Sequence, residues 1–266
     1  MPARHPERIV CLTEETTETL YLLGEERRIV GISGYTVRPP RARREKPRVS
    51  AFLSAHTGKI LALKPDLVLG FSDLQADISK DLVKAGLNVM IFNQRSVEEI
   101  LSMILTLSSL LGVGEKGLQL IKKLEDNLAD IERAAMSFKR RPKVYFEEWD
   151  EPMISGIRWV SELVEIAGGE DIFKELSLSQ AAAGRTIADP NEVVKRNPDV
   201  ILGSWCGKKF RPERVVARPG WDKVSAVKDG QLHEIKSSEI LQPGPAALTD
   251  GVRRIHAILV NAGRRP

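Results

Sequence analysis

Lys59-Ile-Leu-Ala-Leu-Lys-Pro65-Asp66-Leu-Val-Leu-Gly70 is the stretch that decides the fold, because it recurs as Glu192-Val-Val-Lys-Arg-Asn-Pro198-Asp199-Val-Ile-Leu-Gly203. The offset between the two prolines is half the length of the 266-residue chain. A repeat of this size predicts two similar lobes rather than a solenoid of short units. Each copy reads as a helix end, a Pro-Asp turn that cannot continue the helix, and a short apolar strand typical of a parallel sheet.

The same alternation of strands and helices surrounds the first copy. Apolar runs predict strands at 8–12, 29–32, 67–69 and 89–92, and the intervening segments predict helices at 14–23, near Lys59 and at 77–85. Strands that alternate with helices favour parallel pairing with right-handed crossovers.

A long helical pattern separates the two halves. From Ser96 to Arg140 apolar residues recur every three or four positions without a strand, and a new strand begins at 142–146. Beyond it we predict a helix at 160–167, strands at 200–202 and 232–235, and a final helix at 246–259. The predicted domains are an N-terminal α/β lobe at 1–95, a helical connection at 96–141 and a C-terminal α/β lobe at 142–266. The predicted fold class is α/β, with two Rossmann-like lobes built on parallel sheets, a single long helix joining them and a ligand cleft between them.

Composition excludes several classes of protein. Hydrophobic residues make up 42% of the chain and charged residues 29%, and no apolar run approaches the roughly 18 residues of a membrane helix. We therefore expect neither disorder nor membrane insertion. A net charge of +4 spread over the chain does not indicate nucleic-acid binding. Cys11 and Cys206 form no CxxC pair and the four histidines lack metal-ligand spacing, so no metal site is predicted.

The first residues bear on location. A secretory signal would need a basic start, an apolar stretch and a small-residue cleavage point, and residues 1–8 run directly into the predicted strand instead. This predicts a cytoplasmic protein. A trimmed mature form would look the same and would be periplasmic.

Motifs for nucleotide binding and catalysis lack their structural context. Gly112-Val-Gly114-Glu-Lys-Gly117 matches G-x-G-x-x-G, but a predicted helix rather than a strand precedes it, which favours a helix break. Neither cysteine has a neighbouring histidine, and Ser204 lies one position early for a nucleophile elbow. These observations favour a protein that is not an enzyme and has no catalytic cofactor.

Aromatic residues are scarce, at 5% of the chain, so their positions are informative. Six of them fall directly after predicted strands, in segments read as loops: Tyr35, Phe52, Phe71, Trp149, Trp205 and Phe210. Rings at strand ends suit a large, partly apolar ligand, because they offer contact area at low entropic cost.

Charged residues also gather after strands. A basic, proline-rich loop spans Arg38 to Arg48, and a second basic loop holds Lys208-Lys209-Phe210-Arg211. Either loop could hold an anionic group of a ligand, and Lys208 is a candidate contact. The acidic run Glu147-Glu148-Trp149-Asp150-Glu151 could ligate a hard cation, pair with the basic loops, or serve as acid or base in an enzyme.

Segments along almost the whole chain resemble a known family. They are Arg8-Ile-Val-Cys-Leu12, Val30-Gly-Ile-Ser-Gly-Tyr35, Lys64-Pro-Asp-Leu-Val68, Gly86-Leu-Asn-Val89, Ser155-Gly156, Ala167-Gly-Gly-Glu-Asp-Ile-Phe173 and Asn197-Pro-Asp-Val-Ile201. The chain resembles the bacterial substrate-binding proteins of cobalamin and iron-siderophore ABC importers, the periplasmic binding protein class with one bridging helix. The resemblance implies that a corrinoid lies in the interlobe cleft among aromatics, that Tyr35, Phe52 and Phe71 match aromatic positions of the cobalamin-binding pattern, and that Trp149 faces them.

One departure from the resemblance concerns the transporter. Importer-coupled members carry a glutamate on each lobe, ahead of the Pro-Asp repeat, to meet arginines of the membrane permease. The matching positions here are Gly58 and Asn191, with Glu192 adjacent. Together with the missing signal, this implies a family member that binds ligand without serving an importer.

Taken together, the sequence predicts a non-catalytic, monomeric, bilobal binding protein for a corrinoid (cobalamin) or a similar large metal chelate. A first alternative is the siderophore or haem-binding component of an ABC importer, since anionic siderophores explain the basic loops better. A second alternative is an enzyme that acts on a tetrapyrrole or other metabolite through Glu147 to Glu151.

Overall fold

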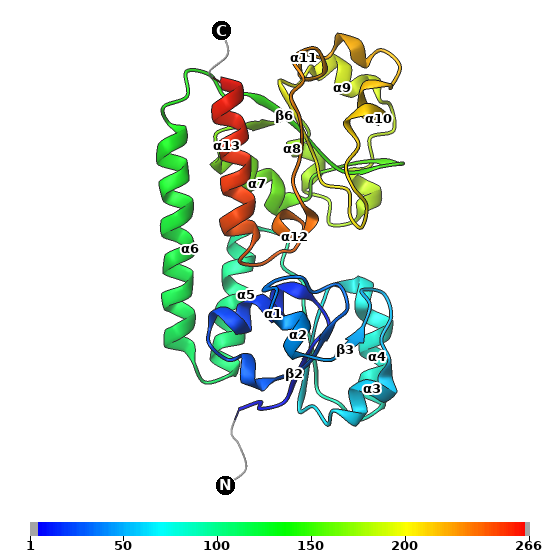
Figure 1. The fold of residues 1–266 in the computed structure, drawn as a ribbon, viewed down its shortest axis with the longest axis vertical. Helices are drawn as coiled ribbons and strands as arrows, with labels where there is room; N and C mark the ends of the chain where they lie inside the picture. Colours follow the sequence, from blue (N-terminus) through cyan, green and yellow to red (C-terminus); the bar gives the residue numbers. More distant parts are fainter. Residues whose placement is uncertain (1–4, 264–266) are drawn as a thin grey trace. The chain divides into compact units, whose positions relative to one another are not determined.

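The computed structural model describes residues 5–263, and these form two compact units. Unit 1 comprises the chain up to residue 94 together with 98–123, and unit 2 comprises 95–97 and the chain from 124 onward. The helical connection predicted for 96–141 is therefore divided between the two units. Figure 1 shows the course of the chain, with unit 1 beginning in blue.

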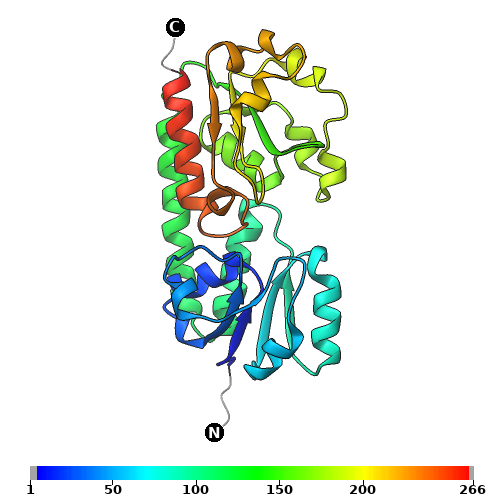
Figure 2. The same ribbon diagram turned by 45° about the vertical axis from the view of Figure 1, so that its right-hand side comes forward.

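Unit 1 is built on a five-stranded parallel sheet. The strand order is β3 (Arg48–Ser50), β2 (Ile29–Ser33), β1 (Ile9–Cys11), β4 (Leu67–Phe71) and β5 (Val89–Phe92). Helices α1 (Glu14–Leu22), α2 (Ala42–Glu45), α3 (Thr57–Ala62) and α4 (Ala76–Lys84) connect the strands. Figures 1 and 2 place α1 and α4 on opposite faces of the sheet. The direction of strand addition reverses between β1 and β4, and such a switch point is where α/β sheets open a crevice for ligands.

Unit 2 holds a second sheet with one antiparallel pair. Strands β6 (Lys143–Asp150), β9 (Val200–Gly203) and β10 (Leu232–Glu234) are parallel, as predicted, and β8 (Glu170–Asp171) adds to β6. Strand β7 (Met153–Ser155) pairs antiparallel with the end of β6 and was not predicted, because three residues are too few to show alternation. The helices of unit 2 are α7 (Arg158–Ile166), α8 (Lys174–Ser177), α9 (Asn191–Arg196), α10 (Pro212–Val216), α11 (Ser225–Lys228), α12 (Ser237–Ile240) and α13 (Val252–Gly263).

The Pro-Asp repeat has one structural role in both units. Asp66 accepts hydrogen bonds from the backbone N–H groups of Glu7 and Arg8 at 2.8 and 3.0 Å, just before β1. Asp199 accepts one from the backbone N–H of Lys143, the first residue of β6, at 2.7 Å. Each aspartate thus joins a helix–strand turn to the first strand of its unit, which confirms the prediction of two similar lobes.

Two helices rather than one continuous helix form the connection. Helix α5 spans Val97–Leu110 and α6 spans Gly114–Ala135, with Gly112 between them at a φ of +72°. The helix break read from the G-x-G-x-x-G segment is confirmed. The chain passes from unit 1 to unit 2 within α6, which is the single long helix that joins them. At Gly117 an added Cβ would lie 1.9 Å from Ser108 Oγ, so the glycine lets α6 pack closely on α5.

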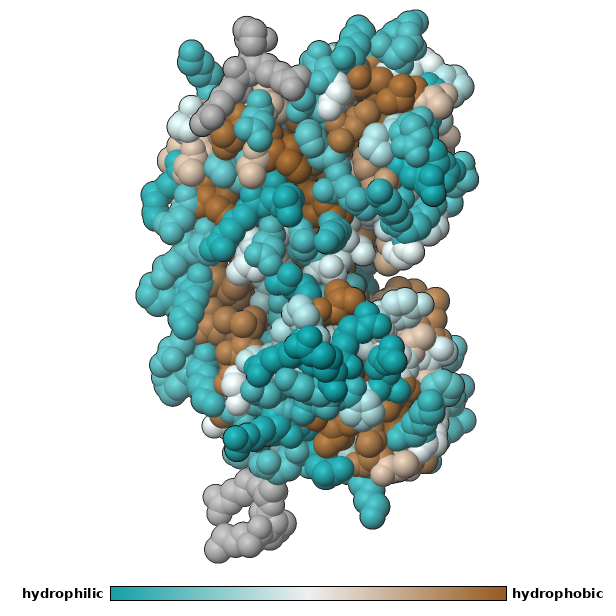
Figure 3. All heavy atoms as spheres, viewed as in Figure 1, coloured by the Kyte–Doolittle hydropathy of each residue, from teal (hydrophilic) through white to brown (hydrophobic). Residues whose placement is uncertain are grey.

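The surface is mainly hydrophilic on the face shown in Figure 3, with smaller hydrophobic patches. Within residues 5–263, no helix combines the length and the apolar character needed to cross a membrane.

Candidate functional site

The loops that follow β2 and β3 present exposed apolar side chains in unit 1. Tyr35, two residues after β2, is 66% exposed, and Leu53, three residues after β3, is 67% exposed. Phe52 beside it is partly buried. Leu74, after β4, is 57% exposed. We call these four side chains, Tyr35, Phe52, Leu53 and Leu74, the apolar surface of unit 1.

Phe71 differs from the other predicted ring positions of unit 1. It is the last residue of β4 rather than a loop residue, and it is only 6% exposed. Sequence reasoning placed the strand end two residues early, at Leu69. The ring is therefore mostly covered, although Phe71 lies at the carboxyl end of β4, three residues before Leu74 of the apolar surface.

Buried carboxylates of α1 hold the loop that carries Tyr35. Glu14 accepts hydrogen bonds from the backbone N–H groups of Val37 and Arg38, and Glu18 pairs with the Arg38 guanidinium at 2.9 Å. Burial raises the pKa of Glu14 to about 7, although the Val37 N–H opposes the shift. The loop is thus tied to α1 at its start.

The rest of the basic loop is tied to the same region. Tyr21 donates a hydrogen bond to Glu45 at 2.7 Å, and the Arg41 guanidinium lies 4.7 Å from the Tyr21 ring centroid. Arg41 also pairs with Glu26 at 3.1 Å. Part of the positive charge of residues 38–48 is therefore neutralised by carboxylates of unit 1.

In unit 2, the acidic run of β6 is paired with cations at successive positions. Glu147 is completely buried and accepts a bidentate pair from Arg218 at 2.6 and 3.0 Å. Tyr145 and Trp205 each donate a further hydrogen bond to Glu147 at 2.9 Å. Glu148 receives the buried Arg185 guanidinium at 2.6 and 3.2 Å. Of the roles considered for this run, pairing with basic side chains is the one that the contacts show.

Lys208 lies over the ring of Trp149. Its ammonium group is 3.9 Å from the Trp149 ring centroid and 5.2 Å from that of Trp205, and it also pairs with Asp150. The Trp149 indole N–H donates to the Glu151 carbonyl oxygen at 2.7 Å, which fixes the ring from its other end. Trp149 is partly exposed and lies within β6 rather than in a loop.

Asp150 neutralises a second cation as well. Arg214 approaches its carboxylate at 2.9 Å and reaches Glu151 at 3.1 Å. Burial alone would raise the pKa of Asp150, but Lys208 and then Arg214 outweigh it, and the pKa lies below its ordinary value. Asp150 is therefore ionised at neutral pH and paired with two cations.

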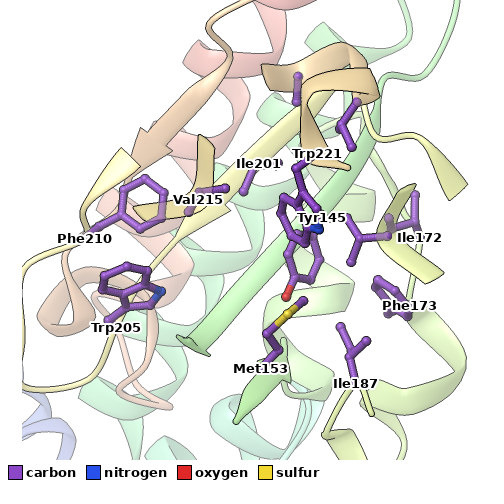
Figure 4. Close-up of a cluster of buried hydrophobic side chains, with 13 residues drawn as sticks. Tyr145, Met153, Ile172, Phe173, Ile187, Ile201, Trp205, Phe210, Val215 and Trp221 are labelled. Carbon is purple, nitrogen blue, oxygen red and sulfur yellow. The ribbon is translucent and has the colours of Figure 1, made fainter. Parts of the chain in front are cut away.

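Trp205 and Phe210 belong to the hydrophobic core of unit 2. Each is only 2% exposed, and their ring centroids lie 5.1 Å apart in an edge-to-face arrangement (Figure 4). An added Cβ at Gly203 would lie 1.9 Å from the Phe210 ring, so this ring packs directly on the backbone of β9. The loop after β9 folds back on its own strand, which the residue pattern did not reveal, and both rings line the interior.

Several polar residues that organise these loops were not found from the sequence. They are Gln75, Glu14, Glu18, Arg185 and Arg218. Gln75 and Glu14 follow the ends of β4 and β1, so their place beside the switch point is the signal that could have found them. Arg185 and Arg218 lie far along the chain from their partners Glu148 and Glu147, and no local pattern indicates such pairs. Across residues 5–263, no three or more His, Cys, Asp or Glu side chains are grouped so as to hold a metal ion.

Comparison with known proteins gives one family for most of the chain. A family model described as "Periplasmic binding protein" matches residues 9–239. The uncharacterized ABC transporter substrate-binding lipoprotein YvrC of Bacillus subtilis is 26% identical over 266 residues, covering 95% of this chain and 79% of that protein. The vitamin B12-binding protein of Vibrio cholerae is 25% identical over 255 residues, covering 94% of this chain and 87% of that protein.

Solved structures show the same fold. The crystal structure of the periplasmic vitamin B12-binding protein of Vibrio cholerae aligns with a TM-score of 0.75 at 25% identity, covering 98% of this chain and 99% of that one. A possible iron-binding, periplasmic solute-binding protein from Staphylococcus epidermidis aligns with a TM-score of 0.83 at 21% identity, covering 96% and 99%.

The prediction of a cytoplasmic location is wrong. The matching family is one of periplasmic binding proteins, and the Bacillus subtilis relative is a lipoprotein of an ABC transporter. The prediction rested on the first residues, of which 1–4 lie outside the described part of the chain. The start of the sequence therefore carries no argument about export.

Proposed function

Since the chain belongs to the periplasmic binding protein family and is a substrate-binding protein of the ABC type, we propose that its ligand is a corrinoid or a similar large metal chelate with apolar faces. The observation that carries this proposal is the apolar surface of unit 1, where Tyr35 and Leu53 leave about two thirds of their area exposed directly after strands. Singly scattered apolar residues are ordinary on a protein surface, but a group on adjacent loops suits a broad ligand. The Vibrio cholerae relative, which matches over 94% of this chain and whose crystal structure has the same fold, is a vitamin B12-binding protein by name.

Trp149 is the contact that we propose in unit 2. Its ring is partly exposed and is fixed by Lys208 and by its own N–H bond. A ring that is already immobilised loses little entropy when a ligand packs on it. Lys208 then acts by holding the ring, and Trp205 and Phe210 support the loop from the core.

The charges near these rings favour a corrinoid over an anionic siderophore. Lys208 and Arg214 meet Asp150, and Arg38 and Arg41 meet Glu18 and Glu26. Cations that are neutralised by carboxylates of the same unit offer less attraction to an anionic ligand. A siderophore or haem remains the second candidate, because Arg43 and Arg44 in α2 and Arg48 in β3 are exposed.

We propose that the protein is not an enzyme. General acid–base catalysis at neutral pH needs an accessible group with a pKa near 7. In the acidic run of β6, Glu147 is completely buried in an ion pair and the pKa of Asp150 is lowered. Burial raises the pKa of Glu15 to about 7, as for Glu14, but these side chains are only 1% and 5% exposed.

For the transporter, we propose that the protein does not dock through a glutamate on each unit. Gly58 lies in the first turn of α3, and Asn191 is the first residue of α9, so the repeat places them at matching points. Beside Asn191, Glu192 is paired with Lys195 at 2.6 Å, and Asp189 is exposed. Beside Gly58 stand the exposed His56 and Lys59, so only the α9 end offers carboxylates.

Ligand identity is tested first by spectroscopy. We expect cyanocobalamin to quench tryptophan fluorescence with a Kd of about 1 μM or tighter, which corresponds to roughly 8 kcal/mol. Trp149 carries the signal if the ligand packs on its ring. Haem and a ferric siderophore serve as competitors in the same titration. Absence of quenching and of calorimetric heat with several corrinoids, together with clear binding of haem or a siderophore, would select the second candidate.

A further inference from the structure

One buried amide joins three loops of unit 1. Gln75 lies in the short 3-10 turn after β4 and has no exposed area. Its side-chain oxygen accepts a hydrogen bond from the Phe71 N–H at 3.0 Å, and its NH2 group donates to the Phe52 carbonyl oxygen at 2.9 Å and to that of Leu12 at 3.5 Å. The side chain therefore links the end of β1, the loop after β3 and the end of β4.

The local backbone is shaped to bring this amide inward. Ser72 has a φ of +64°, a left-handed conformation that costs a serine about 1 kcal/mol or more and persists only where its surroundings hold it. At Gly70 an added Cβ would lie 2.7 Å from the Gln75 side-chain oxygen, so the glycine makes room for the amide. These features place Gln75 at the switch point between β1 and β4, where ligands of α/β sheets bind.

The linked loops carry most of the apolar surface of unit 1. The Phe52 carbonyl that accepts from Gln75 precedes Leu53, and Leu74 immediately precedes Gln75 itself. The buried amide is thus bonded to the residue before Leu53 and is next in the chain to Leu74, whose side chains are 67% and 57% exposed. Hydrogen bonds of a buried side chain can hold such loops in place although that side chain does not contact the ligand.

We infer that Gln75 is the positioning residue of the ligand surface of unit 1, and that Leu53 and Leu74 are ligand contacts beside Phe52. The inference rests on the proposed function for its ligand. The loops after β3 and β4 then select ligands with broad apolar faces, and the Gln75 side chain sets the position of one loop relative to the other.

The first test needs no ligand. Gln75→Met keeps the length of the side chain and removes both hydrogen-bonding groups, so the hydrogen bond from the Phe71 N–H to Gln75 is lost. We expect amide exchange of Phe71, measured by NMR, to accelerate about tenfold, the equivalent of a typical hydrogen bond. Gln119→Met, at an exposed position of α6 in the same unit, is the matched control. Unchanged exchange at Phe71 in Gln75→Met would overturn the positioning role.

The second test uses cyanocobalamin in a double-mutant cycle. We expect Gln75→Met to weaken binding about tenfold and Phe52→Ala by a similar factor, and the double variant to lose much less than the product, because the two residues act through one loop. Gln75→Met combined with Trp149→Ala should lose the full product. Multiplicative losses in both pairs would overturn the inference while leaving the proposed function intact. If wild-type protein binds no chelate, the proposed function fails, and the Phe71 exchange still decides the positioning role.

Gln75→Glu separates positioning from general stability. A neutral glutamic acid can accept from Phe71 and donate to Phe52, whereas a carboxylate faces the Phe52 and Leu12 oxygens without a donor. We expect cyanocobalamin affinity near that of wild type at pH 5 and a loss of about tenfold at pH 8, each relative to wild type at the same pH. An equal loss at both pH values would contradict the role of this hydrogen-bond pair. We expect Leu53→Ser to weaken cyanocobalamin binding while amide exchange of Phe71 stays unchanged, because this side chain contacts the ligand and does not hold the loop. Unaltered cyanocobalamin affinity in Leu53→Ser would show that Leu53 is not a ligand contact.

Discussion

Neighbouring aromatic residues of unit 2 differ in role because they differ in burial. Phe210 is packed between Trp205 and the backbone of Gly203, whereas Trp149 is partly exposed beneath Lys208. We expect Trp149→Ala to weaken cyanocobalamin binding by about 1–3 kcal/mol with little change in Tm. Phe210→Ala should instead lower the free energy of unfolding by about 3–5 kcal/mol. Calorimetric titration and thermal melts on both variants test this contrast. A large decrease in the Tm of Trp149→Ala would show that its ring belongs to the core.

The loss of Glu147 should destabilise unit 2, because its carboxylate belongs to a buried ion pair. Its carboxylate accepts hydrogen bonds from Arg218, Trp205 and Tyr145 within the second half of β6. Removing one partner of a buried ion pair typically costs about 3–5 kcal/mol, because the other charge stays buried. We expect Glu147→Ala to lower the urea midpoint accordingly, and Glu151→Ala, at a side chain 78% exposed, to change it little. Equal effects would contradict a structural role confined to Glu147.

At the scale of elements, α1 buries acidic side chains that make stability depend on pH. Burial raises the pKa of Glu14 and Glu15 to about 7 from 4.5. The folded state therefore holds more protons than the unfolded state between these values, and the stability that these groups contribute is lost as pH rises through about 7. We expect Tm to be higher at pH 5.5 than at pH 8, and Glu15→Gln to flatten this dependence. A slope that is unchanged in Glu15→Gln would contradict the assignment.

The long helical connection shows how an element divides. Apolar spacing of three and four residues predicted helical structure from 96 to 140, and the G-x-G-x-x-G segment predicted a break within it. Gly112 turns the chain at that break, and Gly117 allows α6 to lie close to α5. The glycines of the G-x-G-x-x-G segment are therefore used for helix packing. The glycines themselves indicate where the helix breaks. The apolar spacing before and after the break remains that of a helix, so the spacing alone does not reveal it.

At the scale of the whole molecule, the charges at α3 and α9 predict weak coupling to a cobalamin permease. Rim charges govern encounter and register at an interface, and neither Gly58 nor Asn191 supplies a carboxylate. Gly58→Glu is sterically free, because nothing lies within 4 Å of an added Cβ, and it places an acid in the first turn of a helix. We expect Gly58→Glu with Asn191→Glu to raise association with such a permease in nanodiscs without changing cyanocobalamin affinity. Tight binding of the unmodified protein would contradict this proposal.

Internal repetition and strand–helix alternation determined the fold from sequence alone. Pro65-Asp66 and Pro198-Asp199 mark turns whose aspartates bond the first strand of each unit, and these are local patterns that chemistry dictates at each copy. Tyr35, which follows a predicted strand, is exposed on the surface of unit 1, as its position in the sequence indicated. Turn chemistry, apolar runs and their spacing are properties of neighbouring residues, so they can be read from the chain.

Tertiary structure alone decided which of the candidate residues are exposed. Trp205 and Phe210 follow β9 as Tyr35 follows β2, yet their loop folds back over Gly203 and buries both rings. Lys208 meets Asp150, and Gln75 meets Leu12, across 58 and 63 residues of chain. Burial and long-range pairing depend on which segments the fold brings together, and no local pattern encodes that choice.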